Sequence, residues 1–155
     1  MTKKIHGRHG ARIVAVQGFY AWQLAGLSLR QIEEDLLVGD FYRDPENKEN
    51  RIKISFDKEY LHELLHTIGG AVGTLNALIA PHSDRALEEI HPIELAILWV
   101  ALYELKDRIE IPYKVIINEA ILVAKEFGAQ DSHKFINGIL DKAARVVRQR
   151  EALPA

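Results

Sequence analysis

Residues 124–144 read Ala-Lys-Glu-Phe-Gly-Ala-Gln-Asp-Ser-His-Lys-Phe-Ile-Asn-Gly-Ile-Leu-Asp-Lys-Ala-Ala. Gly128 stands where a left-handed residue ends a helix that starts near Pro112. Asp131 or Ser132 can cap the helix that follows. Apolar residues recur at helical spacing in this last helix, at Phe135, Ile136, Ile139, Leu140, Ala143 and Val147. The segment therefore predicts a helix, a short loop and a second helix.

The same spacing of apolar residues extends through most of the remaining sequence. Gly26 ends an N-terminal helix, Asp57 can cap another, and Pro92 suits the first position of a third. Gly69 and Gly70 each cost a helix roughly 1 kcal/mol relative to alanine, so we expect close packing there. The further helices are expected at 11–25, 29–37, 57–75, 86–90, 92–105 and 112–127.

Residues 40–55 interrupt the helical pattern. They include Asp-Pro-Glu-Asn-Lys-Glu-Asn and little that could be buried. Ile52, Ile54 and Phe56 alternate as in a strand, but the sequence offers no second strand to pair with them. We therefore expect a loop here, and an all-α fold of six or seven helices.

Length and composition set further limits. The chain has 155 residues, the usual size of one domain, so we treat 1–155 as a single domain. Within it we expect a basic flexible start over 1–10, the loop over 40–55 and a tail over 150–155. The chain has no cysteine, no apolar run of about 20 residues and no secretory start, which favours a cytoplasmic protein outside the membrane.

Charge is distributed unevenly along the chain. Residues 1–32 hold five basic and no acidic side chains, whereas 33–131 hold 20 acidic and 10 basic ones. Residues 132–155 hold five basic and two acidic side chains, and the whole chain has a net charge of −2. Clustered lysine and arginine at the two ends suggest a polyanionic partner, although a solvated basic tail has the same composition.

One short motif suggests zinc chemistry. Residues 62–66 read His-Glu-Leu-Leu-His, the H-E-x-x-H pattern in which two histidines hold Zn²⁺ and the glutamate acts as a base. The longer metzincin pattern requires histidine where this chain has Val72. His82 and Glu88 are candidate third ligands only by their distance in sequence. We therefore interpret His62 and His66 as surface residues of a structural helix and expect no metal site.

No other arrangement of residues indicates an enzyme. The sequence has no Walker-type phosphate loop and no G-x-S-x-G motif, and its carboxylates resemble ordinary helix-surface acids. His91, immediately before Pro92, is interpreted as a helix-start residue. We expect no catalytic residue and no cofactor.

Three segments together resemble one known family. They are residues 11–24, residues 101–105 with 111–121, and residues 124–144, the last being the most specific. They resemble the bacterial transcription antitermination factor NusB, and the resemblance runs from Arg8 to about Val147. It implies an all-helical fold of about seven helices in two small packed bundles and no enzymatic activity. It also implies binding to boxA RNA together with NusE, a small-subunit ribosomal protein, within the RNA polymerase antitermination complex on ribosomal RNA operons.

The resemblance also implies which residues act. A family position for partner binding corresponds to Glu94. Tyr20, in the first matching segment, is a further candidate for partner binding because it lies on an amphipathic helix. In the family an arginine-rich start binds RNA, but here His9 and Gly10 replace two of the expected cations, which should weaken RNA binding without NusE. The loop 128–131 is expected to bring Asp131, Lys134 and Phe127 together with Tyr113 near one surface. The full RNA-binding set carried over is Arg8, Arg12, Tyr113, Phe127, Asp131, Lys134 and Phe135.

Alternative interpretations remain at this level. Phe135 and Tyr20 also fit an apolar helix face, and Asp131 also fits a helix cap. The chain could instead be a helical RNA-binding module like those of ribosomal RNA methyltransferases, or, more remotely, a zinc peptidase using His62, Glu63 and His66. The free protein could be a monomer or a homodimer that hides its RNA surface.

Overall fold

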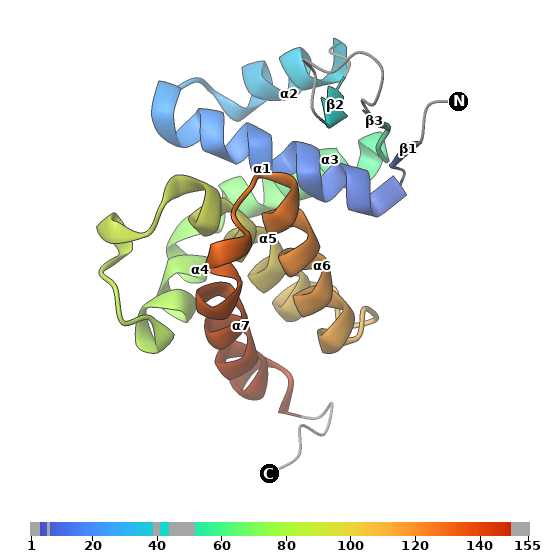
Figure 1. Ribbon diagram of the computed structural model, residues 1–155. Helices are drawn as coiled ribbons and strands as arrows, with labels where there is room; N and C mark the ends of the chain where they lie inside the picture. The colour runs from blue at the N-terminus through green and yellow to red at the C-terminus, as the bar shows by residue number, and fades with distance from the viewer. Residues whose placement is uncertain (1–3, 6, 39–40, 44–51, 150–155) are drawn as a thin grey trace. The chain divides into compact units, whose positions relative to one another are not determined.

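The computed structural model describes residues 4–5, 7–38, 41–43 and 52–149 (Figure 1). The chain divides into two compact units, Met1–Gly69 and Gly70–Ala155, here called the N-terminal and C-terminal units. The described residues form seven α-helices, as the all-α expectation requires. The tail over 150–155 lies outside the described residues.

The N-terminal unit contains three helices, α1 (Gly7–Ala25), α2 (Leu29–Val38) and α3 (Lys58–Gly69). Gly26 ends α1 with a φ of 69°, and the Asp57 carboxylate accepts a hydrogen bond from Tyr60 N at 3.0 Å at the start of α3. Both predicted helix ends are therefore confirmed. Buried Gly18 lets α1 approach its neighbours, because a Cβ there would touch Ile32 and Leu36 of α2 and Leu65 of α3.

A small sheet corrects two sequence expectations. Its strands are β1 (Lys4–Ile5), β2 (Phe41–Arg43) and β3 (Ile52–Ile54), in the order β1-β3-β2. β1 runs parallel to β3, and β2 runs antiparallel to it. The prediction that 52–54 has no strand to pair with is therefore wrong, and 40–55 is not a loop throughout. The described residues of the start over 1–10 include β1 and the first turn of α1.

The helix predicted over 57–75 is two helices. α3 ends at Gly69, and α4 (Val72–Ile79) begins after a short break. Close packing at Gly69 is confirmed, because a Cβ there would overlap the Leu29 side chain. The glycine pair therefore marks a break, which is the other role that glycine plays in a helical pattern.

The C-terminal unit is built around α5 (Pro92–Asp107), which packs against α4, α6 (Tyr113–Glu126) and α7 (His133–Val147) (Figure 1). The central helix has almost no polar face, and its residues from Ala96 to Leu105 are all buried. Three 3₁₀ turns complete this unit: η1 (Ala80–His82), η2 (Leu87–Glu89) and η3 (Gln130–Ser132).

One buried arginine donates hydrogen bonds to the backbone at the C-terminal end of α5. Arg148, just beyond α7, is only 5% exposed. Its guanidinium donates hydrogen bonds to the carbonyl oxygens of Leu105 at 2.6 Å, Ile111 at 2.8 Å, Arg108 at 3.0 Å and Glu104 at 3.1 Å. The carbonyls at the C-terminal end of a helix carry partial negative charge, so a buried cation with several donors is stabilising there.

None of the described helices is by itself long and apolar enough to cross a membrane, although the bent pair Lys58–Gly69 and Val72–His82 has the length and composition for it.

Candidate nucleic-acid interface

The expected cations of the N-terminal unit lie on one aromatic ring. The guanidinium carbon of Arg8 is 4.8 Å from the centre of the Tyr60 ring, and that of Arg12 is 5.8 Å from it. Arg8 is exposed, whereas Arg12 is only 6% exposed. Arg8 can therefore reach a phosphate while it lies over the Tyr60 ring. The buried Arg12 packs beside the same ring and mainly stabilises the fold there. Tyr20, also on α1, is half-buried.

Gly10, which replaces a cation expected from the family, is buried against the chain before α3. A Cβ at this position would overlap the carbonyl oxygen of Ser55. The backbone is held close there, since Asp57 N donates a hydrogen bond to the Gly7 carbonyl at 3.1 Å. An arginine at position 10 would therefore displace this segment, so the missing cation follows from the local packing.

In the C-terminal unit, the start of α5 is held by a capping box. Ile93 N donates to Nδ1 of His91 at 3.1 Å, and His91 N donates to Oε1 of Glu94 at 3.2 Å. The interpretation of His91 as a helix-start residue is confirmed. Glu94 is buried and also accepts a hydrogen bond from Arg85 at 2.9 Å, so the structure gives it an anchoring role.

Arg85 connects this helix start to α7. Its guanidinium carbon lies 3.8 Å from the centre of the Phe135 ring while its Nη1 holds Glu94. Ser83 fixes the backbone of Arg85 through two short hydrogen bonds. Arg85 could not be found from the sequence, because its two partners are 9 and 50 positions away and no local pattern joins them.

Two surface hollows flank this arrangement. One, of about 320 Å³, is lined by His91, Ile93, Glu94, Phe127, Gly128, Ala129 and Ser132. The other, of about 200 Å³, is lined by His82, Asp84, Lys134, Phe135, Gly138, Ile139 and Lys142. Glu94 lines the first and Phe135 the second, so Arg85 contacts a lining residue of each.

The loop after α6 gathers some of the expected residues but not all. Gly128 has a φ of 68°, which confirms the left-handed helix end. Phe127 lies beside it, but Tyr113 begins α6, and 14 residues of helix separate the two by about 20 Å. The expectation that Tyr113 joins this surface is therefore wrong, because Tyr113 and Phe127 occupy opposite ends of one helix.

Asp131 and Lys134 are both exposed near the start of α7. The N-cap position is Ser132, whose side chain makes no capping hydrogen bond, and Asp131 lies in the 3₁₀ turn η3. Asp131 is therefore not the helix cap, and its side chain is exposed to solvent.

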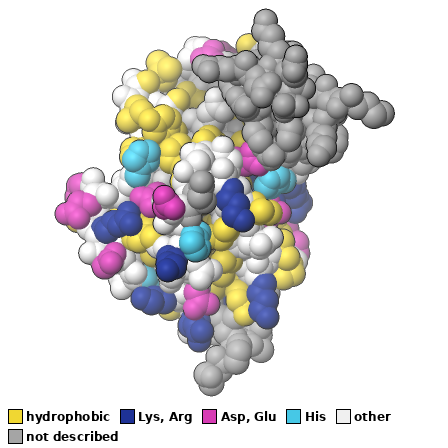
Figure 2. All heavy atoms as spheres, viewed as in Figure 1, with side chains coloured by type: hydrophobic (Ala, Val, Ile, Leu, Met, Phe, Trp, Pro, Cys, Tyr) yellow, Lys and Arg dark blue, Asp and Glu magenta, His cyan; other side chains and the backbone are white. Residues whose placement is uncertain are grey.

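Among the described residues, basic side chains do not form one continuous field on the face seen in Figure 2. Lysine and arginine side chains lie there among acidic and hydrophobic ones over the part of the molecule that carries α7. Arg145, for example, lies 3.5 Å from Asp141, one helical turn away. Such a surface can contact a few phosphates at defined places, which positions a nucleic acid more than it attracts one.

Comparisons with known proteins agree with the resemblance. The model of the NusB family matches residues 9–145. A transcription antitermination protein NusB of Chromohalobacter salexigens is 45% identical over 97% of this chain and 92% of its own length. The corresponding protein of Alcanivorax borkumensis is 43% identical over 94% of this chain and 89% of its own.

Solved structures have the same fold. T. maritima NusB superposes with a TM-score of 0.75 at 26% identity, over 93% of this chain and 95% of that one. A structure of the antitermination factors NusB and NusE in complex with double-stranded RNA has a TM-score of 0.66 at 19% identity, over 89% of this chain and 96% of that one. The second match speaks for the fold alone.

Proposed function

This chain belongs to the NusB family, and we propose that it acts in transcription antitermination by binding boxA RNA together with NusE. The observation that carries the proposal is the 45% identity to a transcription antitermination protein along nearly the full length of both chains. These relatives favour an antitermination factor over the RNA-binding module of a methyltransferase. We also propose that the protein is not an enzyme and that it works in the cytoplasm, where transcription takes place.

The hollows beside Phe127 and Phe135 provide the proposed RNA surface. Single-stranded RNA is read mainly by stacking its bases on aromatic rings or guanidinium planes and by hydrogen bonds to their edges. Arg85 stacked on Phe135 offers such a plane, and Lys134 and Lys142 line the same hollow as Phe135. Glu94 positions Arg85, and the exposed Arg8 supplies a further phosphate contact.

Binding of a short boxA RNA, with and without NusE, tests the proposal. We expect NusE to tighten binding to boxA RNA more than to a scrambled RNA of the same length. A plot of log K against log salt concentration should have a negative slope, and each phosphate contact should make it steeper by about 0.7 for single strands. Equal affinity for the two RNAs in the presence of NusE would contradict the proposal.

A further inference from the structure

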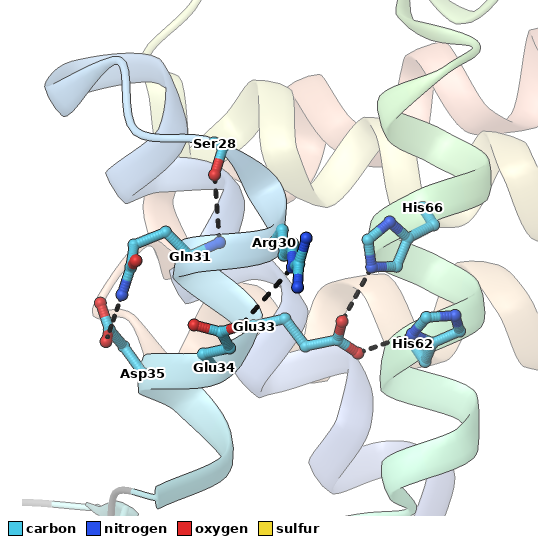
Figure 3. A network of polar contacts seen from close by, with 8 residues as sticks. All are labelled: Ser28, Arg30, Gln31, Glu33, Glu34, Asp35, His62 and His66. Carbon is cyan, nitrogen blue, oxygen red and sulfur yellow. Dashed lines mark hydrogen bonds and ion pairs between the residues drawn. The ribbon is translucent and has the colours of Figure 1, made fainter.

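Two histidines and one carboxylate converge on the N-terminal unit. His62 and His66, one turn apart on α3, both point toward Glu33 of α2 (Figure 3). Nδ1 of His62 lies 2.8 Å from Oε2 of Glu33, and Nε2 of His66 lies 2.8 Å from Oε1. Among the described residues this is the one group of three metal-ligating side chains whose ligand atoms all lie within 4.8 Å of one another.

Glu33 is a third ligand that the sequence pattern did not reveal. The H-E-x-x-H motif provides two histidines, and Glu33 adds a carboxylate from a different helix, 29 positions before His62. Two imidazoles and a carboxylate form a common zinc ligand set, in which solvent takes the fourth position. His62 and His66 side chains are 64% and 39% exposed, so an ion can reach them.

We propose that Glu33, His62 and His66 bind one divalent transition-metal ion, of which Zn²⁺ is the best-suited example, and that the ion joins α2 to α3. With metal–ligand distances near 2.1 Å, ligand atoms in a tetrahedral site are roughly 3.4 Å apart. The two 2.8 Å contacts reach different oxygens of Glu33, and all the ligand atoms lie within 4.8 Å of one another. Side-chain rotations must therefore open the short separations and close the longer ones around the ion.

The carboxylate is the least exposed of the three ligands. The Glu33 side chain is only 13% exposed, and each of its two oxygens faces one imidazole nitrogen. Because the histidines bind an ion only in their neutral form, metal binding should weaken as the pH falls.

Titration of the full, untagged chain with Co²⁺ and Zn²⁺ after treatment with a chelator tests the site. We expect one equivalent to bind, with Co²⁺ giving a visible spectrum typical of few-ligand coordination. Removing a direct ligand by Glu33→Gln, His62→Ala or His66→Ala should weaken binding by at least the roughly 10- to 100-fold that loss of an outer-shell partner costs. Circular dichroism shows whether each variant remains helical.

Two control variants match these changes. Glu34→Gln alters the neighbouring acid of α2, which pairs with Arg30 at 3.6 Å, and His133→Ala removes a histidine of the C-terminal unit. Both should bind metal as the unmodified chain does. Hydrogen exchange adds a second readout, because Zn²⁺ should slow exchange across α2 in the unmodified chain and not in Glu33→Gln.

Three outcomes would overturn the proposal. The first is no binding by the unmodified chain, which would mean that Glu33 only pairs with protonated histidines. The second is binding that survives the double change His62→Ala and His66→Ala, which would place the ion elsewhere, for example at His6 and His9. The third is unchanged affinity in Glu33→Gln, which would exclude the third ligand.

Discussion

A single guanidinium at Arg148 fixes three places in the chain. It donates hydrogen bonds to the carbonyl oxygens of Glu104 and Leu105 at the end of α5, of Arg108 just beyond α5, and of Ile111 before α6. Charge composition alone counts Arg148 among the basic residues available to a polyanion. Because it is buried, the structure assigns it to the fold instead, and the basic C-terminal segment has fewer cations for RNA than its sequence suggests.

Arg148→Ala should therefore lower the free energy of unfolding by about 3 kcal/mol, since it leaves buried carbonyls without their charged donor. Denaturant titration followed by circular dichroism measures the change. Arg145→Ala, an exposed neighbour on α7 that pairs with Asp141, is the matched control and should change stability by less than about 0.5 kcal/mol. Equal effects of the two variants would show that the carbonyl contacts add little.

Arg8 and Arg12 should separate in the same way. Arg8→Ala should weaken binding to boxA and scrambled RNA alike and reduce the salt slope by about 0.7, as loss of one phosphate contact does. Arg12→Ala should mainly lower the melting temperature, because Arg12 is buried beside Tyr60. Salt titrations and thermal melts of both variants measure this, and a reduced salt slope only for Arg12→Ala would reverse the assignment.

At the level of helices and strands, the sequence predicts a helix end correctly wherever a capping or helix-breaking residue lies next to that end. Asp57, Gly26, Gly128 and Pro92 act within a few residues of their own positions, so the sequence could place those helix ends. The sheet could not be predicted, because β1 pairs with a segment about 50 positions away and each strand has only two or three residues.

The same reason limits the site. Phe127, Lys134 and Phe135 were identified because they belong to one continuous segment with a family resemblance. Arg85 and Glu33 were not, because their contacts join segments far apart in the sequence. The role of Tyr113 beside the other residues failed for the opposite reason, since residues of one segment can lie at opposite ends of a helix.

Helix α1 lies close to the segment before α3 at Gly10, and this contact predicts how substitutions of glycine change stability. Gly10→Ala should destabilise the protein by about 1–3 kcal/mol, because the added Cβ meets the Ser55 backbone, which cannot move aside as a side chain can. Gly138→Ala, in α7 where a Cβ would meet nothing within 4 Å, should instead stabilise by up to about 1 kcal/mol. Thermal melts that shift in the same direction for both glycines would contradict this packing.

For the whole molecule, charge and family membership lead to one conclusion about partners. The acidic middle of the chain opposes RNA, the two basic ends favour it, and burial of Arg12 and Arg148 removes two of the cations at those ends. Such a protein should bind RNA weakly by itself and depend on NusE for the affinity that antitermination requires.

In vitro transcription through a terminator placed after a boxA sequence tests this most directly. The reaction contains RNA polymerase, NusE and the remaining antitermination factors, and it is run with and without this protein. Adding the protein should raise read-through on the boxA template, and neither a scrambled boxA nor the omission of NusE should allow the increase. Read-through that stays unchanged on the boxA template, with NusE present and the protein folded, would contradict a role of this protein in antitermination.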